Sequence, residues 1–203
     1  MGADDMAGIP LWLKLLFSLW VLIWAPLYLW QLGPQNYFWL CNLANFLILA
    51  GLWRESPLLL STQLLAVLLV GSVWTLDVGI AFITGNPPVT GTDYMFDSDL
   101  PLWLRLLSLY HVFLPPVCVY GVYRLGYAPR ALPLQTAITV LLILASYLFT
   151  DPERHINWAH PPFEALQGLP AQVYLPLLII LLPALVYLPV HGTILLWRRR
   201  FQG

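Results

Sequence analysis

Long apolar runs separated by short polar turns constrain this sequence more than any other feature. Six of these runs are candidate membrane spans, at about residues 11–30, 36–53, 57–84, 102–125, 131–150 and 170–197. Each is close to the roughly 20 apolar residues that a helix needs to cross a bilayer. Only 9% of the residues are charged, against about 25% in an ordinary soluble domain. The sequence therefore predicts an all-α, polytopic membrane helix bundle, with residues 1–203 forming a single transmembrane domain.

The basic residues indicate the orientation of this bundle. Six spans place both termini on one side of the membrane, and the opposite side then carries only Arg105 and Arg154. The side of the termini collects the other basic residues, which are Lys14, Arg54, Arg124, Arg130 and Arg198 to Arg200. Because basic residues concentrate in cytoplasmic loops, we expect both termini to be cytoplasmic. The long loops 85–101 and 151–169 then face outward, which for a bacterial inner membrane means the periplasm.

Composition also narrows the classes of partner. The formal net charge of −1 offers no basic patch for nucleic acid. The two cysteines, Cys41 and Cys118, fall at different depths and suggest no disulfide framework. We expect membrane lipids as partners, no nucleic acid and no cofactor, with other membrane subunits as further partners.

The second run, 36–53, carries a thiol and two carboxamides in an apolar setting. In a helix, Cys41 and Asn45 are four residues apart and Asn42 and Asn45 are three apart, so the three side chains share one broad face. Polar groups of this kind face protein or water rather than lipid. We therefore expect other helices to bring polar groups to this face.

The predicted topology places several polar side chains in the outer half of the bundle. At 1.5 Å per residue, Cys41 lies about 7 Å, Asp77 about 10 Å and His111 about 13 Å from the outer ends of their spans. Ser146 and Thr150 close the fifth span on the same side. An ionisable residue at such a depth is a candidate functional residue.

These residue types permit nucleophilic catalysis. Cys41 could attack an acyl carbonyl, with His111 taking the thiol proton. Asn42, Asn45 and Ser146 could then orient the substrate or donate to an oxyanion. A cysteine in apolar surroundings is more often inert packing, so the structural interpretation of Cys41 stays open.

Three short segments resemble one family of membrane proteins. The segment YFWLCNLANFL is similar to the Leu-Cys-Asn-Leu helix of the YwaF-like integral membrane family, which is related to eukaryotic cysteine-dependent phospholipid acyltransferases. LSLYHVFLPPVCVYGVYRLGY resembles the helix of that family with a single histidine, and ASYLF resembles the segment before its last helix. The resemblance implies six helices, with Cys41 as nucleophile and His111 as base. This chain has Trp39 where the family often carries a histidine, and Ser146 in place of an asparagine.

Two further sets of residues receive structural interpretations. Asp77 and Arg105 lie near the outer ends of adjacent spans, so we expect a structural ion pair between the third and fourth helices. His155 and His160 could bind a metal, but their spacing matches no metal signature and Pro161 and Pro162 disfavour a helix. A solvated loop is the preferred interpretation, with no metal site.

The leading hypothesis is an integral membrane lipid acyltransferase or acyl hydrolase that uses a Cys41–His111 dyad. A first alternative is a non-catalytic membrane subunit or assembly protein in which the polar cluster locks helices together. A second alternative is a transporter or a helix bundle that binds quinone, haem or metal, for which the absence of an inverted repeat is mildly unfavourable.

Overall fold

The computed structural model describes residues 8–88 and 91–201, and this part of the chain is helical without any strand. The α-helices are α1 (Leu11–Leu32), α2 (Leu40–Trp53), α3 (Pro57–Thr84), α4 (Leu102–Leu107), α5 (Tyr110–Leu125), α6 (Ala131–Phe149), α7 (Glu164–Gln167), α8 (Ala171–Leu182) and α9 (Leu188–Phe201). Short 3₁₀ helices are η2 (Pro34–Phe38), η3 (Asp93–Met95), η4 (Pro152–Arg154) and η5 (Ile156–Trp158), and η6 (Pro183–Tyr187) is a π-helix.

Five of these helical segments are long and apolar enough to cross a membrane. They are Leu11–Leu32, Pro57–Thr84, Leu102–Leu125, Ala131–Phe149 and Ala171–Arg198. The predicted second span is different, because α2 has only 14 residues and is therefore about 21 Å long. The 3₁₀ helix η2 precedes it, and Trp39 separates the two with an extended backbone. The all-α class is thus confirmed for the described residues, and five segments have the length and apolar character of spans, whereas six spans remain a prediction.

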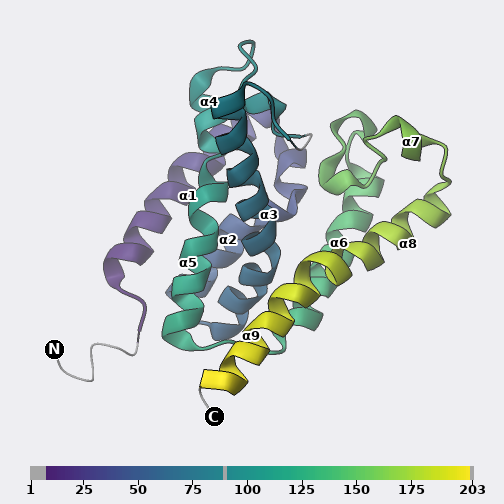
Figure 1. Cartoon of the computed structure of the whole chain (residues 1–203). Helices are drawn as coiled ribbons and strands as arrows, with labels where there is room; N and C mark the ends of the chain where they lie inside the picture. The colour runs from purple at the N-terminus through teal and green to yellow at the C-terminus, as the bar shows by residue number, and fades with distance from the viewer. Residues whose placement is uncertain (1–7, 89–90, 202–203) are drawn as a thin grey trace.

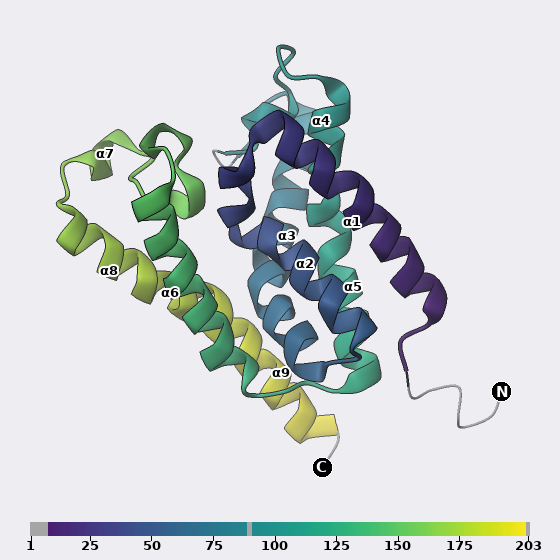
Figure 2. The ribbon, with the colours of Figure 1, turned by 180° about the vertical axis from the view of Figure 1, so that it is seen from behind.

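Helix α3 lies at the centre and contacts α2, α5 and α6 (Figure 1). Helices α1 to α5 form one bundle, and α6, α8 and α9 form a second limb beside it (Figures 1 and 2). Helix α8 diverges from the bundle towards α7 (Figure 1), whereas α6 and η5 stay in contact with η2. Helix α1 begins and α9 ends at the same end of the molecule, which we call the inner end; the opposite end is the outer end (Figure 1).

Small residues let α3 approach its neighbours closely. A Cβ atom on Gly121 of α5 would lie 2.6 Å from Leu60 Cδ1, and one on Gly51 of α2 would lie 2.9 Å from Leu60 Cδ2. Leu60 is fully buried between these two glycines. Small residues at helix contacts are typical of membrane bundles, in which packing replaces the hydrophobic effect.

Local capping explains where α3 begins. Ser56 stands before the helix and its hydroxyl accepts a hydrogen bond from the Leu59 amide at 3.3 Å. Pro57 occupies the first helical position, where its missing N–H costs nothing. The predicted start of the third span at Pro57 is confirmed.

Candidate functional site

Cys41 lies in the first turn of α2 beside two polar groups. Its Sγ lies 3.3 Å from the Tyr110 hydroxyl oxygen and 4.0 Å from Asn42 Oδ1. The same Tyr110 hydroxyl is 2.5 Å from Asn42 Oδ1, and Asn42 Nδ2 donates to the Asn36 carbonyl at 2.7 Å. The thiol, the carboxamide and the phenol thus form one cluster between η2, α2 and α5.

Asn45 joins α2 to α1. Its Oδ1 accepts a hydrogen bond from Trp20 Nε1 at 2.9 Å, and its Nδ2 donates to the Cys41 carbonyl at 3.2 Å. Asn45 is fully buried, so both polar ends of its side chain are satisfied inside the bundle. The prediction that helices meet at the polar face of 36–53 holds for α1 and α5.

His111 follows Tyr110 on α5 but makes different contacts. Its Nδ1 donates to the Ser108 carbonyl at 2.9 Å, since a carbonyl can only accept. Its ring is stacked between Trp74, at 4.7 Å between centroids, and Tyr110, at 4.2 Å. Within residues 8–88 and 91–201, no hydrogen bond joins His111 to Cys41. Tyr110 contacts both members of the predicted dyad, and the dyad stays a prediction.

Aromatic side chains that the sequence interpretation did not single out surround this cluster. Trp24 is fully buried, and its ring lies 4.8 Å from Tyr28 and 5.7 Å from Tyr110 between centroids. The Tyr28 hydroxyl shares a 3.1 Å hydrogen bond with Ser108. Tyr110 could have been predicted from the sequence, because its hydroxyl stands next to His111, the one histidine of the predicted fourth span. Tyr28 and Trp24 gave no such signal, because aromatic residues at span ends are common.

Asp77 and Arg105 contact the same loop and not each other. The Thr92 hydroxyl donates to Asp77, and Arg105 Nη1 donates to the Met95 carbonyl at 3.0 Å. The ion pair present in the described part of the chain is instead that of Lys14 and Glu55. Within the described residues, Asp77 and Arg105 therefore each bond to the segment 92–95 in place of the expected ion pair.

Ser146 is placed in a second cluster, around Asn157 of the outer loop. Asn157 Nδ2 donates to Ser146 Oγ at 3.0 Å and to the Phe38 carbonyl at 2.7 Å, and its Oδ1 accepts from the Leu40 amide at 2.9 Å. Asn157 has a left-handed backbone with φ of 52°, which asparagine tolerates better than most residues. Asn157 thus connects the predicted orienting residue Ser146 to the first residue of α2.

The two outer histidines contact the loop itself. His155 Nδ1 lies 3.2 Å from the His160 carbonyl, and the His160 ring stacks on Tyr147 at 4.9 Å between centroids. Among the described residues, no three His, Cys, Asp or Glu side chains gather into a group that could hold a metal ion. Both histidines are thus held by contacts close to the loop, and the solvated loop stays a prediction.

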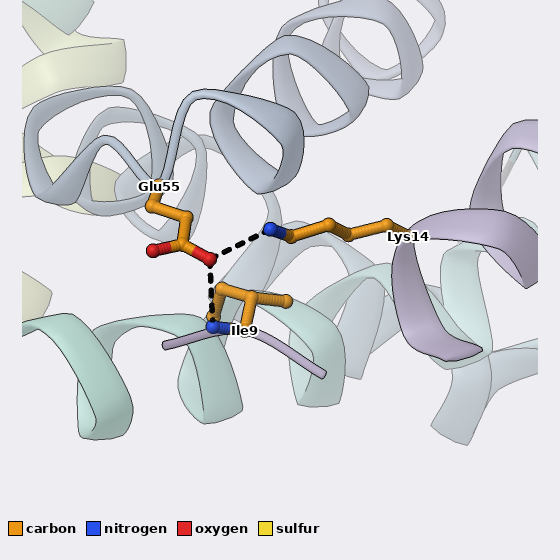
Figure 3. A network of polar contacts seen from close by, with 3 residues as sticks. All are labelled: Ile9, Lys14 and Glu55. Carbon is orange, nitrogen blue, oxygen red and sulfur yellow. Dashed lines mark hydrogen bonds and ion pairs between the residues drawn. The ribbon is translucent and has the colours of Figure 1, made fainter. Parts of the chain in front are cut away.

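A separate polar network fastens α1 at the inner end (Figure 3). Glu55 Oε1 accepts from Lys14 Nζ at 2.6 Å and from the Ile9 amide at 3.2 Å. The hydrogen bond from Lys14, followed by that from Ile9, holds the pKa of Glu55 below its ordinary value. Lys14 also lies 5.9 Å from the centre of the Trp53 ring.

Comparison of this chain with models of known families, with curated proteins and with solved structures finds no match. The resemblance of Tyr37 to Leu47 to the YwaF-like family stays a prediction from short motifs. Any role for Cys41, Asn42 or His111 must therefore be argued from their contacts in this structure.

Proposed function

We propose that this chain is a non-catalytic subunit or assembly partner of a membrane protein complex. The observation that carries the proposal is that the polar side chains of α2 bond to other helices: Asn45 to Trp20 of α1, and Asn42 to Tyr110 of α5. Both polar ends of each carboxamide are occupied. That is expected of a structural tie, whereas a catalytic carboxamide keeps a donor directed at the reacting group.

Exposed apolar faces support a role in assembly. On the outer half of α3, Val73, Leu76 and Ile80 are exposed by 49%, 65% and 43%, and Leu141 and Leu148 of α6 are exposed by 68% and 66%. These two helices border the region where α8 diverges from the bundle (Figure 1). In a bilayer such faces contact lipid or the helices of another subunit.

The proposal includes six crossings, with both termini cytoplasmic, in a bacterial inner membrane. The position of the start of α1 and the end of α9 at one end of the molecule (Figure 1) supports an even number of crossings. Segment 34–53, made of η2 and α2, supplies the sixth. Seven of the nine basic residues then lie on the side of the termini, as basic residues do on the cytoplasmic side.

Site-specific photo-crosslinking in native membranes tests the proposal. A photoreactive residue at Ile80 or Leu148 should give an adduct of one defined mass, whereas one at Leu15 on the lipid-exposed face of α1 should not. The Cys41→Ala variant should give the same adduct, because the thiol contributes little to the ties of α2. Equal labelling from all three positions, without an adduct of one defined mass, would contradict a subunit role.

Acyl transfer or acyl hydrolysis is a second proposal, favoured by one specific contact. The Tyr110 hydroxyl gives its proton to Asn42 Oδ1 at 2.5 Å, and its oxygen lies 3.3 Å from Cys41 Sγ, so the tyrosine that packs against His111 also contacts the thiol. His111 is stacked on the same tyrosine with its Nδ1 donating to Ser108, which leaves Nε2 as its proton-accepting nitrogen. A movement of Tyr110 would then be needed to bring Nε2 to the thiol.

The two proposals differ in what happens to Cys41. Purified protein is incubated with a phospholipid that carries a labelled acyl chain, and the label on the protein is tested for release by hydroxylamine. A catalytic Cys41 forms a hydroxylamine-sensitive thioester that is absent from Cys41→Ala and present in Cys118→Ala. A subunit without acyl chemistry shows no such label in any of the three proteins.

A further inference from the structure

A groove runs along the contact between α3 and α5 on the side away from the Cys41 cluster. Its cavity volume is about 530 Å³, which falls within the usual range of sites for small molecules. Leu68 and Ser72 of α3 form one wall. The other wall belongs to α5 and consists of Pro115, Pro116, Val119, Tyr120 and Tyr123.

The sequence explains why a hollow forms here. A Cβ atom on Gly71 would lie 2.8 Å from the His111 carbonyl oxygen and 2.8 Å from Pro115 Cγ, so only glycine allows the two backbones to come this close. Beside that contact, Ser72 and the short rings of Pro115 and Pro116 fill little space. The larger side chains of Leu68 and Val119 then border a hollow instead of closing it.

The end of the groove nearest the inner end carries polar groups. Arg124 Nη1 donates to the Tyr120 hydroxyl at 2.8 Å, and its guanidinium lies 5.7 Å from the centre of the Tyr120 ring. Tyr123, the last residue of the wall, is 74% exposed. The groove therefore has an apolar length of about 12 Å from Pro115 to Tyr123, at 1.5 Å per residue, and a cationic and phenolic end.

We propose that this groove binds one acyl chain of an anionic phospholipid from the leaflet at the inner end, with the lipid phosphate beside Arg124 and Tyr120. Two features select this occupant. The walls lie within helices that are long and apolar enough to span a membrane, so acyl chains are the abundant molecules at that depth. The positive charge at one end of the groove complements a phosphate at the membrane surface, and tyrosine is favoured at this interface.

Lipid retention on the purified full-length chain tests this site. The protein is equilibrated in nanodiscs with equal amounts of phosphatidylglycerol and phosphatidylcholine, transferred to mild detergent, and the lipids still bound are counted by native mass spectrometry. We expect at least one retained phosphatidylglycerol per protein. Arg124→Gln should lower the ratio of retained phosphatidylglycerol to phosphatidylcholine about fivefold, the effect of one basic residue near an anionic surface, and Arg124→Lys should preserve it.

A matched pair of tryptophan variants tests the groove itself. Val119→Trp fills the groove, and Val173→Trp adds the same bulk on an open face of α8; the two valines are 47% and 46% exposed. Only Val119→Trp should lose the retained lipid. If Val119→Trp fails to fold, Ser72→Leu takes its place. This variant makes a smaller change in the opposite wall and should weaken lipid retention.

Two results would overturn the proposal. Equal retention in both tryptophan variants would mean that the lipid is merely part of the surrounding bilayer. A dimer of this chain that Val119→Trp disrupts, without retained lipid in the unmodified protein, would mean that the groove holds a helix.

Discussion

Replacing Gly71 by alanine tests the closest backbone contact between α3 and α5. The new Cβ would lie 2.8 Å from the backbone oxygen of His111, and neither helix can move away without disturbing the stacked His111 ring. Overpacking of this kind costs about 1–3 kcal/mol. Gly79 of the same helix is the matched control, because a Cβ there meets nothing within 4 Å.

The control removes the effect of helix propensity. Alanine is favoured over glycine in a helix interior by about 0.5–1 kcal/mol, and both variants gain this amount. The free energy of unfolding of Gly71→Ala should therefore fall below that of Gly79→Ala by about 1–3 kcal/mol. Titration with SDS in mixed micelles, followed by the fluorescence of the ten tryptophans, measures both values. Equal free energies for the two variants would refute the close approach of α3 and α5 at this depth.

Three other contacts give measurable predictions. A double-mutant cycle of Trp20→Phe and Asn45→Leu should show a coupling energy of about 0.6 kcal/mol, the mean for hydrogen bonds between membrane helices, and no coupling would remove the tie between α1 and α2. Because the pKa of Glu55 is held below its ordinary value of 4.5, the stabilisation from its contacts should be present above pH 4.5 and disappear as the pH falls through the lowered pKa; Glu55→Gln should remove this dependence. Asn157→Gly should lower the free energy of unfolding by at least about 1 kcal/mol by leaving buried backbone groups unsatisfied, whereas His155→Gly, at a φ of 46°, should be neutral or stabilising.

Apolar runs and turn residues were enough to locate most helices. The predicted third span, 57–84, coincides with α3, and the fifth, 131–150, differs from α6 by one residue. The signal is strong here because a bilayer demands long, continuous apolar segments. The predicted second span was less accurate: Gly33 and Pro34 begin a 3₁₀ turn, and α2 starts only at Leu40.

The site was harder to predict, since depth alone does not decide which side chains meet. Cys41 and His111 were expected to pair because both lie in the outer half of the bundle. On α5, however, Tyr110 and His111 are adjacent and project in directions about 100° apart, given 3.6 residues per turn. Tyr110 takes the position facing Cys41, and the His111 ring packs against Trp74 instead. Likewise, Arg105 donates its hydrogen bond to the Met95 carbonyl and not to Asp77.

The short helix α2 raises a physical question that Asn157 answers. In the proposed bundle of six crossings, a helix of about 21 Å does not cover a hydrocarbon layer of about 30 Å, and unsatisfied backbone groups cost several kcal/mol within it. At the outer end of α2 the Leu40 amide and the Phe38 carbonyl both bond to the Asn157 side chain, so a residue from the distant outer loop supplies the partners that a further helical turn would have provided. This requires the loop around Asn157 to reach the level of Leu40, and the strain of its left-handed residues, His155, Asn157 and Trp158, must be offset by the contacts that Asn157 makes there. Ser146 accepts a hydrogen bond from Asn157 of this loop, so its polar group is used in the second cluster and not beside Cys41.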